Sequence, residues 1–191
     1  MSIIPDCVDD QMEVPEEPVP ITGIQLQAED SGGSLAMPFY GFARPSADYF
    51  NSNLILHNFV ITDITSGVNH VLLYDERHQG KGADALCSTR LRYHLHAKEK
   101  RESAGIEARA SMSLLDNCVG QNKSQVVMMF NCMLSILFYQ KVTALYLNPG
   151  HSHMMPDRVV AWCKGSIRGL NLYSPLQLAE VMSTVKSVEA S

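Results

Sequence analysis

From residue 54 onward, the sequence alternates between segments typical of β-strands and segments typical of α-helices. Residues 54–63 and 69–75 are rich in β-branched and aromatic side chains and flank a turn, which predicts a β-hairpin. Further strands are predicted at 106–115 and 142–147, and helices at 83–102, 122–140, 156–167 and 175–187. Strands that alternate with helices predict parallel strands covered on both faces. We therefore expect an α/β fold whose mixed sheet has an N-terminal antiparallel hairpin, then parallel strands, with helices on both faces.

The charge is divided unevenly along the chain. The 191 residues carry a net charge of −5, yet residues 1–43 hold eight of the 20 acids and no Lys or Arg. Residues 44–191 hold all 15 bases and the other 12 acids, a net charge of +3. Prolines and repelling like charges favour extended chain. The sequence therefore predicts an acidic, proline-rich flexible arm over 1–43 and a single domain over 44–191, whose charge permits a nucleic-acid partner.

Composition excludes several protein classes. The five cysteines form no CxxC pair, which argues against a zinc ribbon and for a reduced, intracellular protein. No signal peptide is recognisable at the N-terminus. The longest apolar run, 126–139, is interrupted by polar residues and is shorter than the ~20 residues of a membrane helix. We expect an intracellular protein without a membrane partner.

Two loops carry side chains suited to chemistry. Asp116 ends a predicted strand and a helix follows, and ligands in α/β sheets bind at the carboxyl ends of strands. Asp116 is then a metal ligand or acid–base group, or else a turn and cap residue. The second loop follows the strand 142–147 and holds His151, His153 and Asp157. Its alternative interpretation is a solvated loop in which Asp157 caps the next helix.

The predicted hairpin contributes further carboxylates. Asp63 ends its first strand, and Asp75 and Glu76 end its second. Hard divalent cations prefer several converging oxygen ligands, although a single acid at a strand end is more often a turn residue.

Two clusters have simpler alternatives. The bases Arg90, Arg92, Lys98, Lys100 and Arg101, with His94 and His96, form either a phosphate-binding stripe or a solvated helix face. Six apolar or sulfur-containing side chains of the helix at 122–140 are expected in the core together with Trp162: Met128, Met129, Cys132, Met133, Ile136 and Leu137.

Two sequence blocks together resemble a known family. The first is Asp116-Asn117-Cys118-x-Gly120-Gln121-Asn122-Lys123; the second, about thirty residues later, is Gly150-His151-Ser152 followed by Asp157. They are similar to the blocks of an uncharacterised, transposon-associated domain family with "DNC-x-GQNK" and "GH[ST]…D" motifs. The resemblance covers about residues 50–180. It implies an RNase H-like fold, as in DDE transposases and retroviral integrases, a DNA partner and a nuclear rather than cytoplasmic location.

The resemblance also implies a mechanism. RNase H-like nucleases place one acid on the first strand, one at the end of the fourth and one on a late helix. Asp63, Asp116 and Asp157 would hold two Mg²⁺ or Mn²⁺ ions for DNA strand cleavage or transfer, and His151 would position water or contact phosphate. The implied nucleic-acid contacts are Asn117, Gln121, Asn122, Lys123 and Arg158.

The chain departs from this pattern at two positions. Asn58 occupies the middle of the predicted first strand, and Ala85, next to Asp84, occupies a position that is acidic in the family. One alternative is therefore a catalytically decayed module that binds nucleic acid or protein. Another is a cysteine hydrolase with Cys118 as nucleophile, His151 as base and Asp157 as orienting group.

Overall fold

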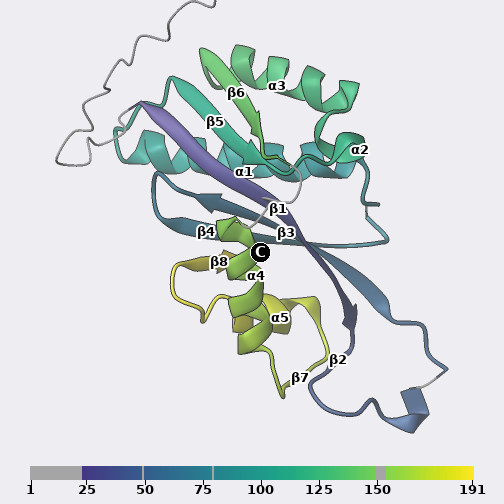
Figure 1. The fold of residues 1–191 in the computed structure, drawn as a ribbon. Coiled ribbons are helices and arrows are strands. Elements are labelled where there is room, and N and C mark those ends of the chain that lie inside the picture. The colour runs from purple at the N-terminus through teal and green to yellow at the C-terminus, as the bar shows by residue number, and fades with distance from the viewer. Residues whose placement is uncertain (1–22, 49, 79, 149–153) are drawn as a thin grey trace, which may run out of the picture.

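A long strand outside the predicted domain forms the centre of the sheet. The computed structural model describes residues 23–48, 50–78, 80–148 and 154–191 (Figure 1). Strand β1, Ile24–Met37, pairs antiparallel with β3 on one side and parallel with β5 on the other. The remaining elements, in chain order, are β2 Phe39–Tyr40, a 3₁₀ turn Ser46–Asp48, β3 Leu54–Asp63, β4 Val68–Asp75, α1 Ala83–Ser103, β5 Ala110–Leu115, α2 Val119–Asn122, α3 Gln125–Leu137, β6 Lys141–Tyr146, α4 Met155–Ser166, β7 Asn171–Leu172, α5 Pro175–Met182 and β8 Val188–Ala190.

The main sheet is mixed, as the sequence predicts. Its strand order is β6-β5-β1-β3-β4-β8, and the antiparallel hairpin β3–β4 precedes the parallel pair β5–β6. The predicted hairpin strand 54–63 has the bounds observed for β3. Strand β8 adds a parallel edge strand beside β4, although the sequence indicates a helix as far as residue 187. A second, two-stranded sheet joins β2 to β7.

The prediction of a flexible arm over residues 1–43 is wrong for 24–40, which form β1 and β2. Residues 1–22 lie outside the described part of the chain. The sequence misleads here because β1 is polar at alternate positions: Gln25, Gln27 and Glu29 are each at most 3 % exposed. Strand signals rest on apolar or alternating side chains, whereas Gln25 and Glu29 find partners on α1 and Gln27 donates to Glu29. The domain therefore begins earlier than residue 44.

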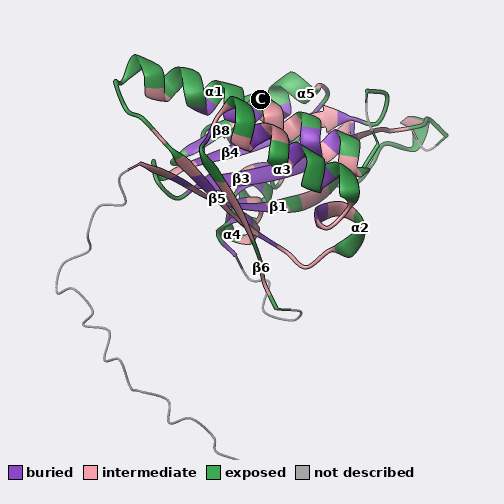
Figure 2. Ribbon diagram, turned by 90° about the horizontal axis from the view of Figure 1, so that it is seen from above, coloured by how far each residue is buried: buried purple, intermediate pink, exposed green. Residues whose placement is uncertain are grey.

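Helices cover both faces of the sheet. On one face α1 packs on Phe59, Ile61 and Leu72, and α3 packs on α1. On the other face α4 and α5 pack on Val60 and Val71. In Figure 2, β3 and β4 between these layers are coloured mostly as buried, whereas the edge strand β6 is intermediate to exposed. Among the described helices, none is both long and apolar enough to cross a membrane.

The outer face of α3 corrects the prediction that its apolar residues all belong to the core. Met129 is 73 % exposed and Ile136 is 81 % exposed, and Trp162 on α4 is 45 % exposed. Only Val127, Phe130 and Leu134 of α3 are buried. Apolar composition predicts burial of the helix as a whole, but a helix that packs on one side buries only one stripe.

A β-bulge brings α4 close to β1. The register between β1 and β3 shifts between Ser31 and Gly33. At the extra residue, Gly32, a Cβ atom would lie 2.7 Å from Nδ2 of Asn58 and 2.8 Å from Cγ2 of Val160 on α4. The absence of a side chain at Gly32 thus permits the close approach of α4 to the sheet, two residues beyond Asp30.

We predict that Gly32→Ala destabilises the fold by about 1–3 kcal/mol, because the added methyl group overpacks the β1–α4 contact. Urea denaturation measures the change. Gly165→Ala on α4 is the matched control: a Cβ there has nothing within 4 Å, and alanine stabilises a helix by about 0.5–1 kcal/mol relative to glycine. Equal effects of the two substitutions would contradict this account of Gly32.

Candidate functional site

Consecutive residues of β1 face opposite sides of the sheet. Glu29 points toward α1, where it pairs with Arg90, and the next residue, Asp30, lies on the side of α4. Leu115, the last residue of β5, stands beside Glu29 in the parallel register, and Asp116 follows directly. The sheet therefore brings Asp30 and Asp116 together although 86 positions separate them in the sequence.

Two carboxylates, those of Asp116 and Asp157, lie close enough to Asp30 for their charges to act on it. Its pKa is raised to about 6, first by burial and then by the negative charges of Asp157 and Asp116, against a hydrogen bond from the backbone N–H of Ser31. Asp157 lies in the first turn of α4, where its Oδ2 accepts a 2.9 Å hydrogen bond from the N–H of Met154. The repulsion from Asp116 and Asp157 indicates that negative charge is concentrated around Asp30, where the sheet meets α4.

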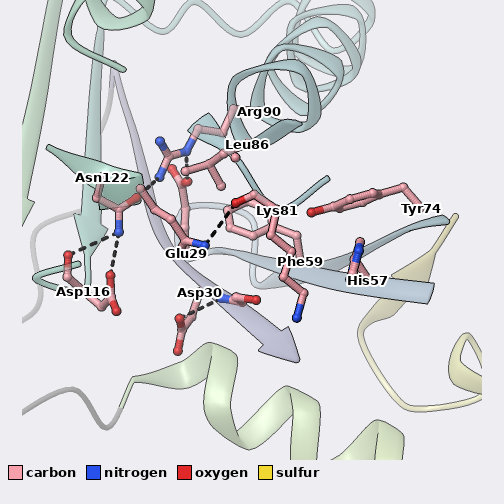
Figure 3. Close-up of a pocket in the computed structure, with 13 residues that line it drawn as sticks. Glu29, Asp30, His57, Phe59, Tyr74, Lys81, Leu86, Arg90, Asp116 and Asn122 are labelled. Carbon is pink, nitrogen blue, oxygen red and sulfur yellow. Dashed lines mark hydrogen bonds and ion pairs between the residues drawn. The ribbon is translucent and has the colours of Figure 1, made fainter. Parts of the chain in front are cut away.

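Hydrogen bonds fix the orientation of Asp116. Its Oδ1 accepts a 2.6 Å bond from Nδ2 of Asn122 and a 3.1 Å bond from the N–H of Cys118. Asn122 in turn accepts a 3.0 Å bond at Oδ1 from Nη2 of Arg90 (Figure 3). A relay therefore runs from Arg90 through Asn122 to the carboxylate of Asp116.

Arg90 begins this relay as half of a buried ion pair. Its Nε donates to Oε2 of Glu29, and the two side chains are 4 % and 2 % exposed. Burial alone would raise the pKa of Glu29, but the charge of Arg90 and hydrogen bonds from Gln27 and Arg90 lower it overall. Glu29 is thus ionised at neutral pH, and from the α1 face of the sheet it holds Arg90 in place.

A small pocket opens beside these residues. It has a volume of about 20 Å³ and is lined on its rim by His57, Tyr74 and Lys81 as well as Asp30 and Asp116. A single water needs roughly 10–15 Å³, so the space suits water molecules or ions rather than an organic cofactor. Burial and the charge of Lys81 lower the pKa of His57, whose Nδ1 lies 3.1 Å from Oγ of Ser34.

Asp63 does not belong to this group, contrary to the sequence prediction. It stands opposite Gln27, three residues along β1 from Asp30 and on the α1 face of the sheet, where its Oδ1 accepts a hydrogen bond from the N–H of Ser66. It lines a different cavity, between β4 and the C-terminal part of α1. Asp75, the other hairpin acid, instead pairs with Arg77 and His78 at its own turn. Both acids behave as strand-end residues.

The predicted nucleic-acid contacts divide into two groups. Asn122 is buried and engaged with Asp116 and Arg90, so its position is structural. The side chain of Lys123 bonds to Oδ1 of Asn117 and lies over the ring of Tyr146. The other two predicted contacts, which lie nearer to solvent, are Gln121 and Arg158.

Two sequence expectations lie partly outside the described residues. His151 and His153 belong to the segment 149–153, so neither the role of His151 in phosphate contact nor its role as a base for Cys118 has a structural counterpart here. Cys118 precedes α2, whose four residues make it a single turn.

The predicted basic stripe on α1 is interrupted, because Arg90 and His94 are only 3 % and 1 % exposed.

Sequence reasoning missed Asp30 and Arg90 as site residues. Both were assigned to other roles, Asp30 to the arm and Arg90 to a solvated or phosphate-binding face. A usable signal was the alternation Gln25-Leu26-Gln27-Ala28-Glu29-Asp30, which has the period of a strand even though its inward side is polar.

The comparison with known proteins covers the second half of the chain. Residues 109–190 match a protein family described only as a domain of unknown function (DUF7869). The matched region includes Asp116 and Asp157, but not Asp30 or Arg90. No curated protein and no solved structure matches this chain.

We predict that Asp30→Asn stabilises the fold by about 1–2 kcal/mol at pH 7–8, after allowance for solvent screening. The folded state keeps a proton on Asp30 up to pH about 6, whereas an unfolded chain loses it near 3.8. Ionisation of Asp30 therefore lowers the free energy of unfolding as pH rises through 4–6, and the Asn variant lacks this loss. Urea denaturation of both proteins at pH 4 and pH 7.5 measures the difference in stability, which should be small at pH 4. The control Asp84→Asn, at an exposed position, should change stability by no more than about 0.5 kcal/mol at either pH.

We predict that Arg90→Met destabilises the fold by about 3–5 kcal/mol at neutral pH, because it leaves the Glu29 charge buried without a partner. The double variant Glu29→Gln with Arg90→Met should recover part of the loss, since no lone charge then remains in the sheet. Urea denaturation of both variants measures the coupling. Equal stability of single and double variants would contradict a buried charge as the cause.

Proposed function

We propose that the chain is an RNase H-like domain that cleaves or transfers DNA strands with the help of Mg²⁺ or Mn²⁺, held by Asp30, Asp116 and Asp157. The observation that carries the proposal is the gathering of these carboxylates, since both Asp116 and Asp157 raise the pKa of Asp30. Several converging carboxylates are the ligands that hard divalent cations require.

The order of the strands supports the proposal. When the two-residue β2 is set aside, β1 is the first strand and β5 the fourth. Asp30 then lies on the first strand, Asp116 at the end of the fourth and Asp157 on a late helix, which is the pattern implied by the family resemblance. Asn58 no longer departs from it, because Asn58 lies on the second strand, β3. One departure from the family pattern remains: Ala85, buried in the first turn of α1, stands at a position that is acidic in the family.

The donor set fits such ions. Asp30 and Asp116 receive hydrogen bonds from amide groups, and within the described ranges neither forms an ion pair with Lys or Arg. A cation bound between them would relieve the repulsion that raises the pKa of Asp30. Asp30, Asp116 and Asp157 would hold two such ions, which would supply the Lewis-acid chemistry for hydrolysis of a phosphodiester.

The chain's own residues have distinct tasks in this proposal. Asn122, held by Arg90, keeps the Asp116 carboxylate in one orientation. Lys81, which lines the pocket, attracts the phosphate. The small pocket leaves the scissile bond at the surface, as a long DNA substrate requires.

We predict that the purified chain nicks supercoiled DNA in the presence of Mg²⁺ or Mn²⁺, and that Asp30→Asn and Asp116→Asn each lower the rate by at least about 100-fold. Loss of a ligand removes several kcal/mol of transition-state stabilisation, and each 1.36 kcal/mol is a factor of ten. The assay follows conversion of supercoiled plasmid to the open circle.

Asp63→Asn is the matched control, because Asp63 is also a buried acid of the sheet but lies on its α1 face, in a different cavity. Its nicking rate should equal that of the unmodified chain. Cleavage that survives both Asp30→Asn and Asp116→Asn would disprove the proposed site. Salt-sensitive DNA binding without any cleavage would instead favour the decayed module, for which the departure at Ala85 is the supporting observation.

A further inference from the structure

A second group of ligand-type side chains lies far from the carboxylates. His70 on β4, His96 on α1 and Glu189 on β8 each offer one ligand atom, and these three atoms all lie within 4.8 Å of one another. The strand β8 runs beside β4 at the edge of the sheet (Figure 1). Elements far apart in the sequence thus converge on one point.

The separations between these atoms are unlike those of hydrogen bonds. Nδ1 of His70 lies 3.5 Å from Oε2 of Glu189, and Nε2 of His96 lies 3.8 Å from the same oxygen. Hydrogen bonds between nitrogen and oxygen span roughly 2.7–3.2 Å. Ligands at about 2.0–2.2 Å from a tetrahedral zinc ion lie about 3.3–3.6 Å apart. The separation between His70 and Glu189 therefore matches that between two ligands of one zinc ion, and the separation between His96 and Glu189 is slightly longer.

We propose that His70, His96 and Glu189 bind a zinc-class transition-metal ion through Nδ1, Nε2 and Oε2. Imidazole and carboxylate ligands together suit Zn²⁺, whereas Mg²⁺ prefers oxygen ligands alone. Three protein ligands leave a fourth position open. A cavity of about 240 Å³ lined by all three side chains, together with the rim residues Arg92 and Ser191, gives water access to it.

A hydrogen-bonding partner orients the carboxylate of Glu189. Lys100 donates to Oε1 at 2.8 Å and to Oε2 at 2.9 Å. An ion at Oε2 leaves the bond to Oε1, which then orients the ligating carboxylate.

The ion would hold the strand β8 in place. β8 has three residues and pairs only with β4 among the described strands. A metal bond from Glu189 to His96 would join β8 to α1 as well, across the open face of the cavity. The site would therefore have a structural role, since it would join β8 to α1. It does not depend on the proposed nuclease activity, because none of its three ligands lines the carboxylate pocket.

Zinc titration with a competing chromogenic chelator tests the proposal. We expect one zinc ion to bind the unmodified chain at this site. Loss of a residue that only hydrogen-bonds to a ligand weakens metal sites roughly 10–100-fold, so His96→Gln and Glu189→Gln should each weaken binding by about 100-fold or more. Co²⁺ in place of zinc should give the intense visible absorption of a tetrahedral site, and both variants should lose it. Zinc should also slow hydrogen exchange of the β8 amides in the unmodified chain, but not in His96→Gln or Glu189→Gln.

His78→Gln is the matched control. His78 is exposed like His96 and also lies beside a carboxylate, but at a hydrogen-bonding distance of 2.8 Å from Asp75. Its removal should leave zinc affinity and the cobalt spectrum unchanged, and His96→Gln should fold normally because the side chain is 48 % exposed. The proposal is overturned if the unmodified chain binds no zinc, or if His96→Gln and Glu189→Gln bind it as tightly as His78→Gln does.

Discussion

The ion pair between Glu29 and Arg90 is the interaction on which the rest of the site depends. Two charged side chains are almost completely buried between the sheet and α1, and such a pair is tolerated only when further hydrogen bonds satisfy both partners. Gln27 supplies one of these bonds to Glu29, and Asn122 accepts one from Arg90. Because Asn122 then bonds to Asp116, a core interaction determines where a surface carboxylate points.

The two faces of one strand explain why adjacent acids behave differently. Glu29 faces a guanidinium group and has a lowered pKa, whereas Asp30 faces other carboxylates and has a raised one. A strand alternates the direction of successive side chains, so a shift of one residue exchanges a stabilised charge for a destabilised one. The bulge at Gly32 and the close approach of α4 keep this register. Residues that strain a fold in this way are common where a ligand completes the charge balance.

Helix α1 connects two regions of different chemistry. Its N-terminal half contributes Leu86 and Arg90 to the lining of the carboxylate pocket. Its C-terminal half presents His96 and Lys100 to Glu189 on β8. The buried middle of the helix, including Tyr93 and His94, separates the two. Carboxylates gather at one end, and two imidazoles with the Glu189 carboxylate at the other, so the two proposed sites would take different classes of cation.

Local sequence determined the elements whose signal is carried by apolar residues and turns. The hairpin β3–β4, helix α1 and strands β5 and β6 follow from periodicity, because their inward side chains are apolar or their ends are marked by turn residues. Asp116 and Asp157 could be identified as site residues, since each lies where a strand or loop meets a helix. Only the tertiary structure decided that β1 is the central strand and that Asp30, not Asp63, joins them. The physical reason is that the buried polar groups of β1 are stabilised by partners such as Arg90, 61 residues away, and no local pattern records a partner at that distance.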